Sequence, residues 1–107
     1  MLKKIFAHRG ASAYAPENTL PAFEKAVDIC ADGVELDIHL SRDSRLVVIH
    51  DEMLDRTTNG HGFVKDFTLA ELKKLDASKT MTNSGFCNLR IPTLGEVYEL
   101  LADTELL

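Results

Sequence analysis

The sequence has few cysteines, no long apolar run and no excess of basic residues. Its two cysteines, Cys30 and Cys87, have neither the spacing of a metal site nor the density of a secreted disulfide scaffold. No stretch approaches the ~20 apolar residues of a membrane span. The start Met1-Leu2-Lys3-Lys4 has no apolar segment for export. These absences argue against a transmembrane or secreted protein, and we expect a cytoplasmic one.

The charge balance argues against a nucleic-acid-binding protein. The formal net charge is −5, and the 12 lysines and arginines form no basic run. An anionic substrate must therefore be attracted locally. The length of 107 residues and the 45% apolar content suit one domain with a modest core, and there is no internal repeat or interdomain linker.

The most informative segment alternates apolar and polar residues from Val34 to Leu40. This pattern predicts a strand with Glu35, Asp37 and His39 on one face. Carboxylates two residues apart on a strand lie ~6.5 Å apart, so both can reach one hard cation such as Mg²⁺ or Ca²⁺. The alternative is a half-exposed strand whose polar face only meets water.

A second strand is predicted over residues 46–50. The connection before it is too short for a parallel crossover and suits an antiparallel hairpin. If the turn is Asp43-Ser44, Asp37 lies opposite His50, which places an imidazole beside the two carboxylates. A one-residue change of register would instead place His50 on the other face.

The first strand is predicted over residues 3–7 and runs into His8-Arg9-Gly10. The carboxyl end of a strand is a frequent place for chemistry in α/β folds. Arg9 offers a rigid fork that matches phosphate oxygens, and Gly10 would let the backbone turn sharply beside a ligand. The alternative is a solvated loop start.

Three helices are predicted around these strands. The stripe Leu20, Phe23, Val27 and Cys30 marks one buried helical face, with Asn18 or Thr19 as the cap, so Cys30 is expected to pack in the core. Two capping boxes open the other helices, at Thr68 with Glu71 and at Thr93 with Glu96, and the last helix directs Leu94, Val97, Tyr98, Leu100 and Leu101 toward the core.

Six short motifs together resemble one family. In order and spacing they are similar to the N-terminal motifs of glycerophosphodiester phosphodiesterases, which are related to phosphatidylinositol-specific phospholipases. The motifs are His8-Arg9-Gly10, Ala15-Pro16-Glu17-Asn18-Thr19, Gly33-Val34-Glu35-Leu36-Asp37, Val47-Val48-Ile49-His50-Asp51, Leu54-Asp55-Arg56-Thr57-Thr58 and Ile91-Pro92-Thr93-Leu94.

The resemblance implies a fold, an activity and a set of roles. The fold is the α/β class, as the N-terminal portion of a TIM-type (β/α)₈ barrel with a β-hairpin, and residues 51–90 form a small loop and helix insertion on the active-site side. The activity is metal-dependent hydrolysis of a small glycerophosphodiester to an alcohol and glycerol 3-phosphate. Glu35 and Asp37 would bind Mg²⁺ or Ca²⁺, His8 and His50 would be the acid/base pair, and Arg9 would bind the substrate phosphate.

The length departs from the family, because such a barrel needs ~250 residues and at least ~200. We therefore expect residues 1–107 to be one partial barrel domain, with an apolar run beginning at Leu106. The resemblance implies that a further metal-binding glutamate and a lysine follow Leu107. A partial barrel exposes sheet edges, so we expect self-association, strand exchange or marginal stability.

Three functional hypotheses follow. The first is the phosphodiesterase barrel represented by its N-terminal part. The second is a catalytically silent truncated module that self-associates or binds a partner through its sheet edge and residual metal site. The third is a small α/β domain that uses the acidic pair on another phosphoester, as a nuclease does, although the lack of a basic surface disfavours long nucleic acids.

Overall fold

The computed structural model describes residues 4–82, 84–102 and 104. The expected strand start at Lys3 and the expected apolar ending at Leu106 and Leu107 lie outside these residues. In chain order the elements are β1 (Phe6–His8), α1 (Leu20–Asp28), β2 (Gly33–Glu35), β3 (Ile38–Leu40), β4 (Leu46–Val48), the 3₁₀ turn η1 (Val64–Asp66), α2 (Leu69–Leu72), the 3₁₀ turn η2 (Lys79–Met81) and α3 (Leu94–Leu101). Among the described residues, no helix has both the length and the apolar character that crossing a bilayer requires.

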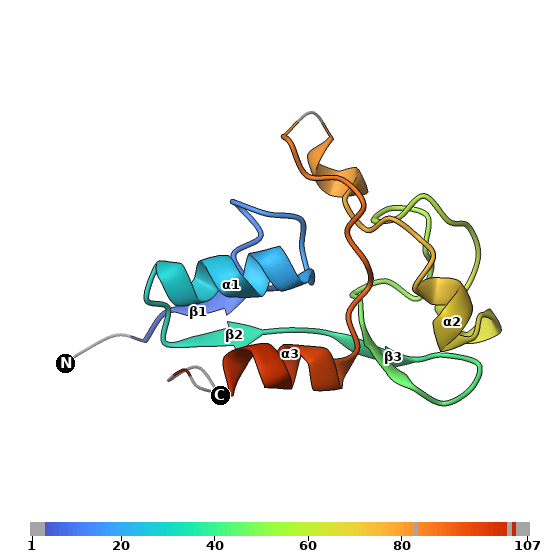
Figure 1. The fold of residues 1–107 in the computed structure, drawn as a ribbon, viewed down its shortest axis with the longest axis horizontal. Helices are drawn as coiled ribbons and strands as arrows, with labels where there is room; N and C mark the ends of the chain where they lie inside the picture. Colours follow the sequence, from blue (N-terminus) through green and yellow to red (C-terminus); the bar gives the residue numbers. More distant parts are fainter. Residues whose placement is uncertain (1–3, 83, 103, 105–107) are drawn as a thin grey trace.

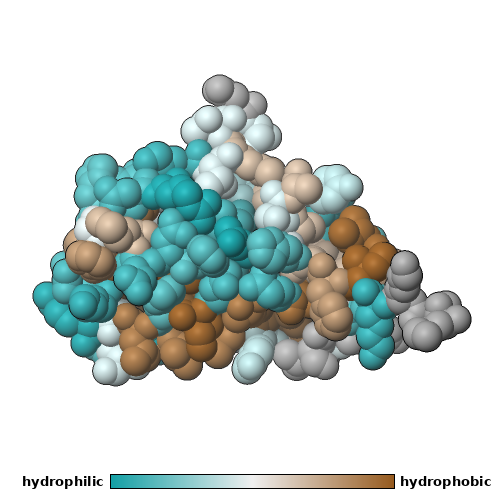
Figure 2. Space-filling model, turned by 180° about the vertical axis from the view of Figure 1, so that it is seen from behind, coloured by the Kyte–Doolittle hydropathy of each residue, from teal (hydrophilic) through white to brown (hydrophobic). Residues whose placement is uncertain are grey.

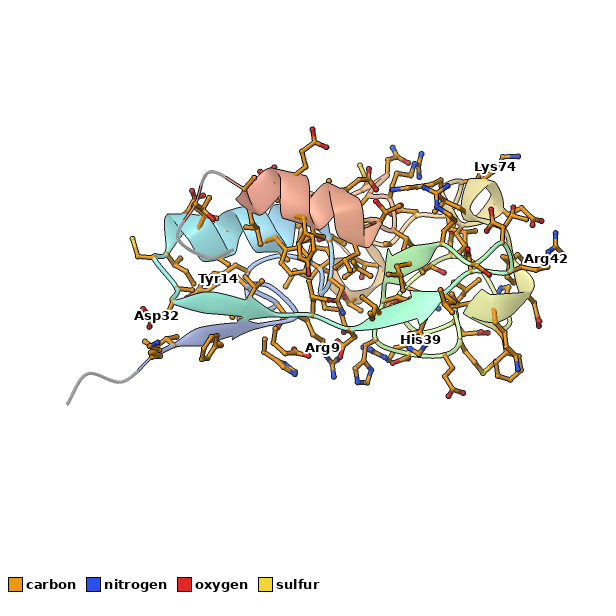
Figure 3. All side chains as sticks on the ribbon, turned by 90° about the horizontal axis from the view of Figure 1, so that it is seen from below. Arg9, Tyr14, Asp32, His39, Arg42 and Lys74 are labelled. Carbon is orange, nitrogen blue, oxygen red and sulfur yellow. The ribbon has the colours of Figure 1, made fainter. Side chains whose placement is uncertain are left out.

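β1, α1 and β2 form a parallel βαβ unit. The register runs from Phe6 opposite Gly33 to His8 opposite Glu35. Because the strands are parallel, His8 and Glu35 lie at the same carboxyl edge. Figure 3 shows α1 and α3 on one side of these strands and the labelled side chain of Arg9 on the other.

The strand expected over residues 34–40 is divided between two sheets. β2 pairs with β1, and β3 pairs with β4 in an antiparallel hairpin. Figure 1 shows β2 and β3 along one extended ribbon, with α1 and α3 at one end and α2 at the other. The strand is divided because its two parts have different partners. β1 ends at His8, opposite Glu35, and the pairing with β4 starts only at Ile38, opposite Val48. Asp37 lies between the two strands, and its carbonyl accepts a hydrogen bond from Ile49 N–H at 2.9 Å.

The expected hairpin register is wrong by one residue. Ile38 pairs with Val48 and Leu40 with Leu46, so Asp37 faces Ile49 and not His50. The cause is the turn, which has three residues, 42–44, and not two. Ser44 adopts φ 61°, a left-handed conformation that takes up the extra residue. His50 therefore lies beyond the end of β4, and its position is set by the loop that follows.

The expected core position of Cys30 is also wrong, because Cys30 is exposed. α1 ends at Asp28, and Cys30 adopts φ 57°. Its N–H bonds to the carbonyl of Val27, and Ala31 N–H bonds to the carbonyl of Ala26. These two bonds form the left-handed helix end known as the Schellman motif, which turns Cys30 away from the apolar face.

β4 separates two apolar clusters, because successive strand residues point to opposite faces. On one side Val48 packs with Phe23, Val97 and Leu101 from α1 and α3. On the other side Val47 belongs to a cluster with Ile49, Ile91 and four residues of the 51–90 segment: Leu54, Val64, Leu72 and Ala77. Burying both faces of β4 fixes the strand that carries the loop of His50.

Both predicted capping boxes are confirmed. Thr68 and Glu71 exchange side-chain and backbone hydrogen bonds, and so do Thr93 and Glu96. Tyr98, expected to face the core, is instead exposed. It follows Val97 by one helical position and so lies about 100° around α3 from that buried residue.

Candidate active site

The carboxyl ends of β1 and β2 hold the first part of the site. The Nε2 atom of His8 lies 3.5 Å from Oε2 of Glu35. The same Oε2 accepts a hydrogen bond from the backbone N–H of Arg9 at 3.0 Å. The parallel register therefore brings the predicted acid/base residue His8 beside the predicted metal ligand Glu35.

Arg9 and Gly10 make the sharp turn after β1. Arg9 has φ 54° and Gly10 has φ 76°, both in the left-handed region. A Cβ on Gly10 would lie 2.8 Å from Cβ and 2.9 Å from the carbonyl carbon of Ala22. The sharp turn predicted at Gly10 is confirmed, and glycine is required there because the turn packs closely against α1. The turn directs the Arg9 side chain under the ribbon, on the same side as His39 (Figure 3).

Asp37 is held by two side chains from the loop after β1. Its Oδ2 atom accepts a hydrogen bond from Asn18 Nδ2 at 3.2 Å and lies 3.7 Å from Arg9 Nε. Asn18 is buried, and its backbone N–H bonds to the Arg9 carbonyl at 2.8 Å. The helix cap is Thr19, so Asn18 orients Asp37 and the Arg9 turn instead of capping α1.

Glu35 and Asp37 provide the oxygen ligands that Mg²⁺ and Ca²⁺ prefer. Their side chains are 41% and 24% exposed, so both remain accessible to a cation. Within the described residues, no three side chains of His, Cys, Asp or Glu gather into a metal-binding group. The pair therefore fits a hard cation in donor type, and the other coordination positions must be filled by water, substrate or further protein.

His50 lies in the loop after β4. Its Nδ1 atom is 2.7 Å from Oδ1 of Asp51, and its backbone carbonyl contacts Nε2 of His39 at 2.8 Å. An ionised carboxylate only accepts hydrogen bonds, so Nδ1 of His50 carries the proton. A small cavity is lined by residues that include Glu17, Asn18 and His50, so the loops after β1 and β4 face one space.

Arg56 joins these two loops. Its Nη1 and Nη2 atoms donate to the two carboxylate oxygens of Glu17 at 2.6 and 3.0 Å. Its Nε and Nη2 atoms donate to the two oxygens of Asp51 at 2.9 and 3.0 Å. Glu17 also accepts from Arg9 Nη1 at 3.0 Å.

The contacts form one continuous network that contains all five predicted site residues. It runs from His8 through Glu35 to the Arg9 turn, which also holds Asp37. From there it passes through Glu17, Arg56 and Asp51, to which the sequence assigned no catalytic or ligand-binding role, and it ends at His50. All three stand within the motifs that carry the family resemblance, and that position is the one signal that could have pointed to them.

The arginines favour the ionised forms of Glu17 and Asp51. The hydrogen bonds from Arg56 and His50 hold the pKa of Asp51 far below its usual range. Burial raises the pKa of Glu17, but the hydrogen bond and charge of Arg56, together with Arg9, outweigh it, so the net pKa is lowered. In return, the hydrogen bonds from Glu17 and Asp51 raise the pKa of Arg56.

These pKa shifts predict a pH dependence of stability. A carboxyl whose pKa is lower in the folded state stabilises the fold above its ordinary pKa, and this contribution is lost as the pH falls through the lowered value. The free energy of unfolding should therefore decline as the pH falls below about 4.5, the ordinary pKa of Glu17. Arg56→Met should make that decline shallower, as measured by urea unfolding between pH 6 and ~2. Equal slopes in the two proteins would contradict the prediction.

Known proteins resemble this chain over most of its length. The sequence profile of the glycerophosphoryl diester phosphodiesterase family matches residues 8–106. A glycerophosphodiester phosphodiesterase of Caldanaerobacter subterraneus subsp. tengcongensis is 57% identical over 103 residues, which are 96% of this chain and 42% of the relative. A putative glycerophosphodiester phosphodiesterase of Bacillus subtilis, YhdW, is 60% identical over 87% of this chain and 38% of its own length.

Solved structures give the same result. The crystal structure of a glycerophosphodiester phosphodiesterase from Agrobacterium tumefaciens superposes with a TM-score of 0.87 at 44% identity, over 94% of this chain and 43% of that one. A phosphodiesterase from Oleispira antarctica, solved with the product sn-glycerol-3-phosphate, superposes with a TM-score of 0.83 at 40% identity, over 94% and 40% of the two chains.

These matches define the class of the fold, which is part of a TIM-type α/β barrel. The chain belongs to the glycerophosphoryl diester phosphodiesterase family. It spans about two fifths of the length of the relatives and solved structures that it matches. The predicted fold class and family resemblance are thus confirmed.

Proposed function

We propose that this chain is the N-terminal part of a metal-dependent phosphodiesterase that hydrolyses glycerophosphodiesters to an alcohol and glycerol 3-phosphate. The observation that carries the proposal is the single contact network that contains His8, Arg9, Glu35, Asp37 and His50. The names of the relatives and the product bound to the Oleispira antarctica enzyme support the substrate class.

Cleavage of a phosphodiester requires three things from a site. Charge on the non-bridging oxygens must be neutralised, a nucleophile must lose a proton, and the leaving oxygen must gain one. Arg9 is held by Glu17 in a fixed position and presents a planar guanidinium to the first task. Glu35 and Asp37 would hold Mg²⁺ or Ca²⁺, which, when bound, adds positive charge beside the phosphate.

His8 and His50 would carry out the two proton transfers. One imidazole takes a proton in its neutral form, and the other gives one in its charged form. His8 is exposed at the end of β1, and His50 commits Nδ1 to Asp51, which leaves its Nε2 to exchange protons. Each such transfer typically contributes about 10²–10⁴-fold to the rate.

The metal site is incomplete within the described residues, which supports the view that residues 1–107 form one partial barrel domain. Two carboxylates satisfy a minority of the ~6–8 oxygen positions that Ca²⁺ takes. Apolar side chains on and next to the short strands are exposed, among them Ile5, Phe6, Ile38 and Leu40. Figure 2 shows a band of apolar surface along one edge of the molecule. In a longer protein, the remaining strands would cover such residues and supply further ligands, and residues 51–90 would stand as an insertion on the active-site side.

The same observations favour a second candidate function for the 107-residue chain alone. A chain with an incomplete metal site and exposed strand residues would be a catalytically silent module that self-associates or binds a partner through these strands. The two functions differ in whether the polypeptide turns over substrate.

The test is a release assay for glycerol 3-phosphate from glycerophosphocholine. We expect a full-length barrel that contains this chain to release the product with Mg²⁺ or Ca²⁺, to stop after chelation and to recover when metal is restored. Activity that survives chelation would remove the role given to Glu35 and Asp37. If the full-length protein is inactive on glycerophosphodiesters with either metal, the proposed enzyme is wrong and the silent module is favoured.

A further inference from the structure

Arg56 occupies a place in the network that the proton-transfer chemistry alone does not explain. Its guanidinium uses all three nitrogens on two carboxylates that come from separate loops, Glu17 after β1 and Asp51 after β4. Glu17 is only 10% exposed and therefore gives the guanidinium a firm anchor. Lysine could not reproduce this arrangement, because an ammonium group has no planar fork.

The contact with Asp51 has a definite geometry. Nε donates to Oδ2 at 2.9 Å, and Nη2 donates to Oδ1 at 3.0 Å, which is a bidentate pair along one side of the guanidinium. The Oδ1 atom of Asp51 also accepts the Nδ1 proton of His50 at 2.7 Å. Arg56 therefore fixes the carboxylate oxygen that in turn determines which nitrogen of His50 carries a proton.

A second histidine and aspartate pair in the same segment provides a comparison. Nδ1 of His61 lies 3.0 Å from Oδ2 of Asp55, but the side chain of His61 is 81% exposed and none of the described arginines bonds the Asp55 carboxylate. This pair shares the residue types of the His50 and Asp51 pair without the arginine anchor. Of these two pairs, only that of His50 and Asp51 has an arginine bound to its carboxylate.

We propose that Arg56 is a positioning residue for His50: by bridging Glu17 and Asp51 it holds the Asp51 carboxylate on Nδ1, so that Nε2 is the nitrogen presented to the substrate. This role rests on the proposed phosphodiesterase function. Because Glu17 also binds Arg9, the same bridge sets the distance between the phosphate-binding arginine and the proton-transferring histidine. Arg56 itself touches neither the substrate nor the reacting atoms in this role.

Kinetics on the full-length barrel test the bridge. Arg56→Met should lower kcat by about 10–100-fold, the usual loss when a residue that orients a ligand or catalytic group is removed, with KM changed by less than about threefold. KM is spared because Arg9 keeps its own bond to Glu17. Arg56→Lys should recover only part of kcat, and millimolar guanidinium should partly restore Arg56→Ala. Arg42→Met is the matched control, since Arg42 pairs with Glu71 in the hairpin region outside the network and should leave kcat unchanged.

A spectroscopic experiment separates positioning from folding. The ¹⁵N chemical shifts of His50 should report the tautomer with a proton on Nδ1 in the wild-type protein. Asp51→Asn keeps the side-chain shape but offers an amide donor, so the shifts should move toward the tautomer with the proton on Nε2, and kcat should fall with kcat/KM. Asp55→Asn should leave both the His50 shifts and kcat unchanged.

Two results would overturn the positioning role. The first is that Arg56→Met has the same kcat as the wild-type protein. The second is that His50 keeps its wild-type tautomer in both Asp51→Asn and Arg56→Met. If the wild-type protein hydrolyses no phosphodiester, the proposed function fails while the tautomer measurement still decides whether Arg56 and Asp51 orient His50. If the wild-type protein is active and the Arg56 variants match it, the inference fails alone.

Discussion

Replacing either His8 or His50 with alanine should lower kcat of the full-length barrel by about 10²–10⁴-fold, because each substitution removes one proton transfer. The fold should survive both changes. The two side chains are 66% and 42% exposed and belong to neither of the two main apolar clusters, so the free energy of unfolding should change by at most about 0.5 kcal/mol. Initial rates at saturating glycerophosphocholine and urea unfolding check the two parts separately.

His61→Ala is the matched control for these variants. His61 is an exposed imidazole paired with Asp55 and lies outside the network, so its removal should leave kcat unchanged. Near-normal turnover in His8→Ala or His50→Ala would defeat the assignment of an acid/base pair. A fall in kcat accompanied by a large loss of stability would show instead that the histidine holds the loop.

Local signals in the sequence predicted the two capping boxes and the presence of the hairpin correctly. The capping boxes at Thr68 and Thr93 depend on residues three positions apart, so the pattern contains the whole interaction. The hairpin was predictable for the same reason, since the short connection between 40 and 46 excludes a parallel crossover. Such features need no knowledge of distant partners.

The register of the hairpin and the end of α1 were not predictable from pattern alone. Both depend on a left-handed residue that is not glycine, Ser44 in the turn and Cys30 after the helix. Left-handed backbone is uncommon for residues with a Cβ, and a prediction from sequence normally assigns it to glycine or asparagine. The prediction placed Asp37 opposite His50 and Cys30 in the core, whereas in the structure Asp37 faces Ile49 and Cys30 is exposed.

The candidate site shows how a wrong register can accompany a correct grouping. The prediction placed His50 beside the carboxylates by cross-strand pairing with Asp37, but Asp37 faces Ile49. His50 joins the group instead through Asp51 and Arg56. The contact between Arg56 and Glu17 spans 39 residues, and no pattern of local spacing could reveal it. The roles of the five site residues stay predictions until the variants are measured.

The second large effect concerns the metal. Glu35→Gln and Asp37→Asn keep the shape of each side chain and an oxygen that can still accept from Arg9 N–H or from Asn18. Each removes one negative charge from the pair that would hold Mg²⁺ or Ca²⁺. Loss of a residue that only orients a ligand typically costs 10–100-fold in metal affinity, so loss of a ligand itself should cost more than about 100-fold. Rates at limiting metal should fall accordingly, and raising the metal concentration should restore part of the loss.

The control for these variants is a carboxylate just before β2, at the end opposite Glu35. Asp32 accepts a hydrogen bond from Ile5 N–H at 2.6 Å, and Figure 3 shows it at the other end of β2 from Arg9. Asp32→Asn should therefore leave the metal concentration for half-maximal rate unchanged, while the Glu35 and Asp37 variants raise it. A metal dependence that is the same in all three variants and the wild-type protein would show that the cation binds elsewhere. A shift in Asp32→Asn as large as in the others would show that net charge, and not ligation at the carboxyl ends of the strands, attracts the metal.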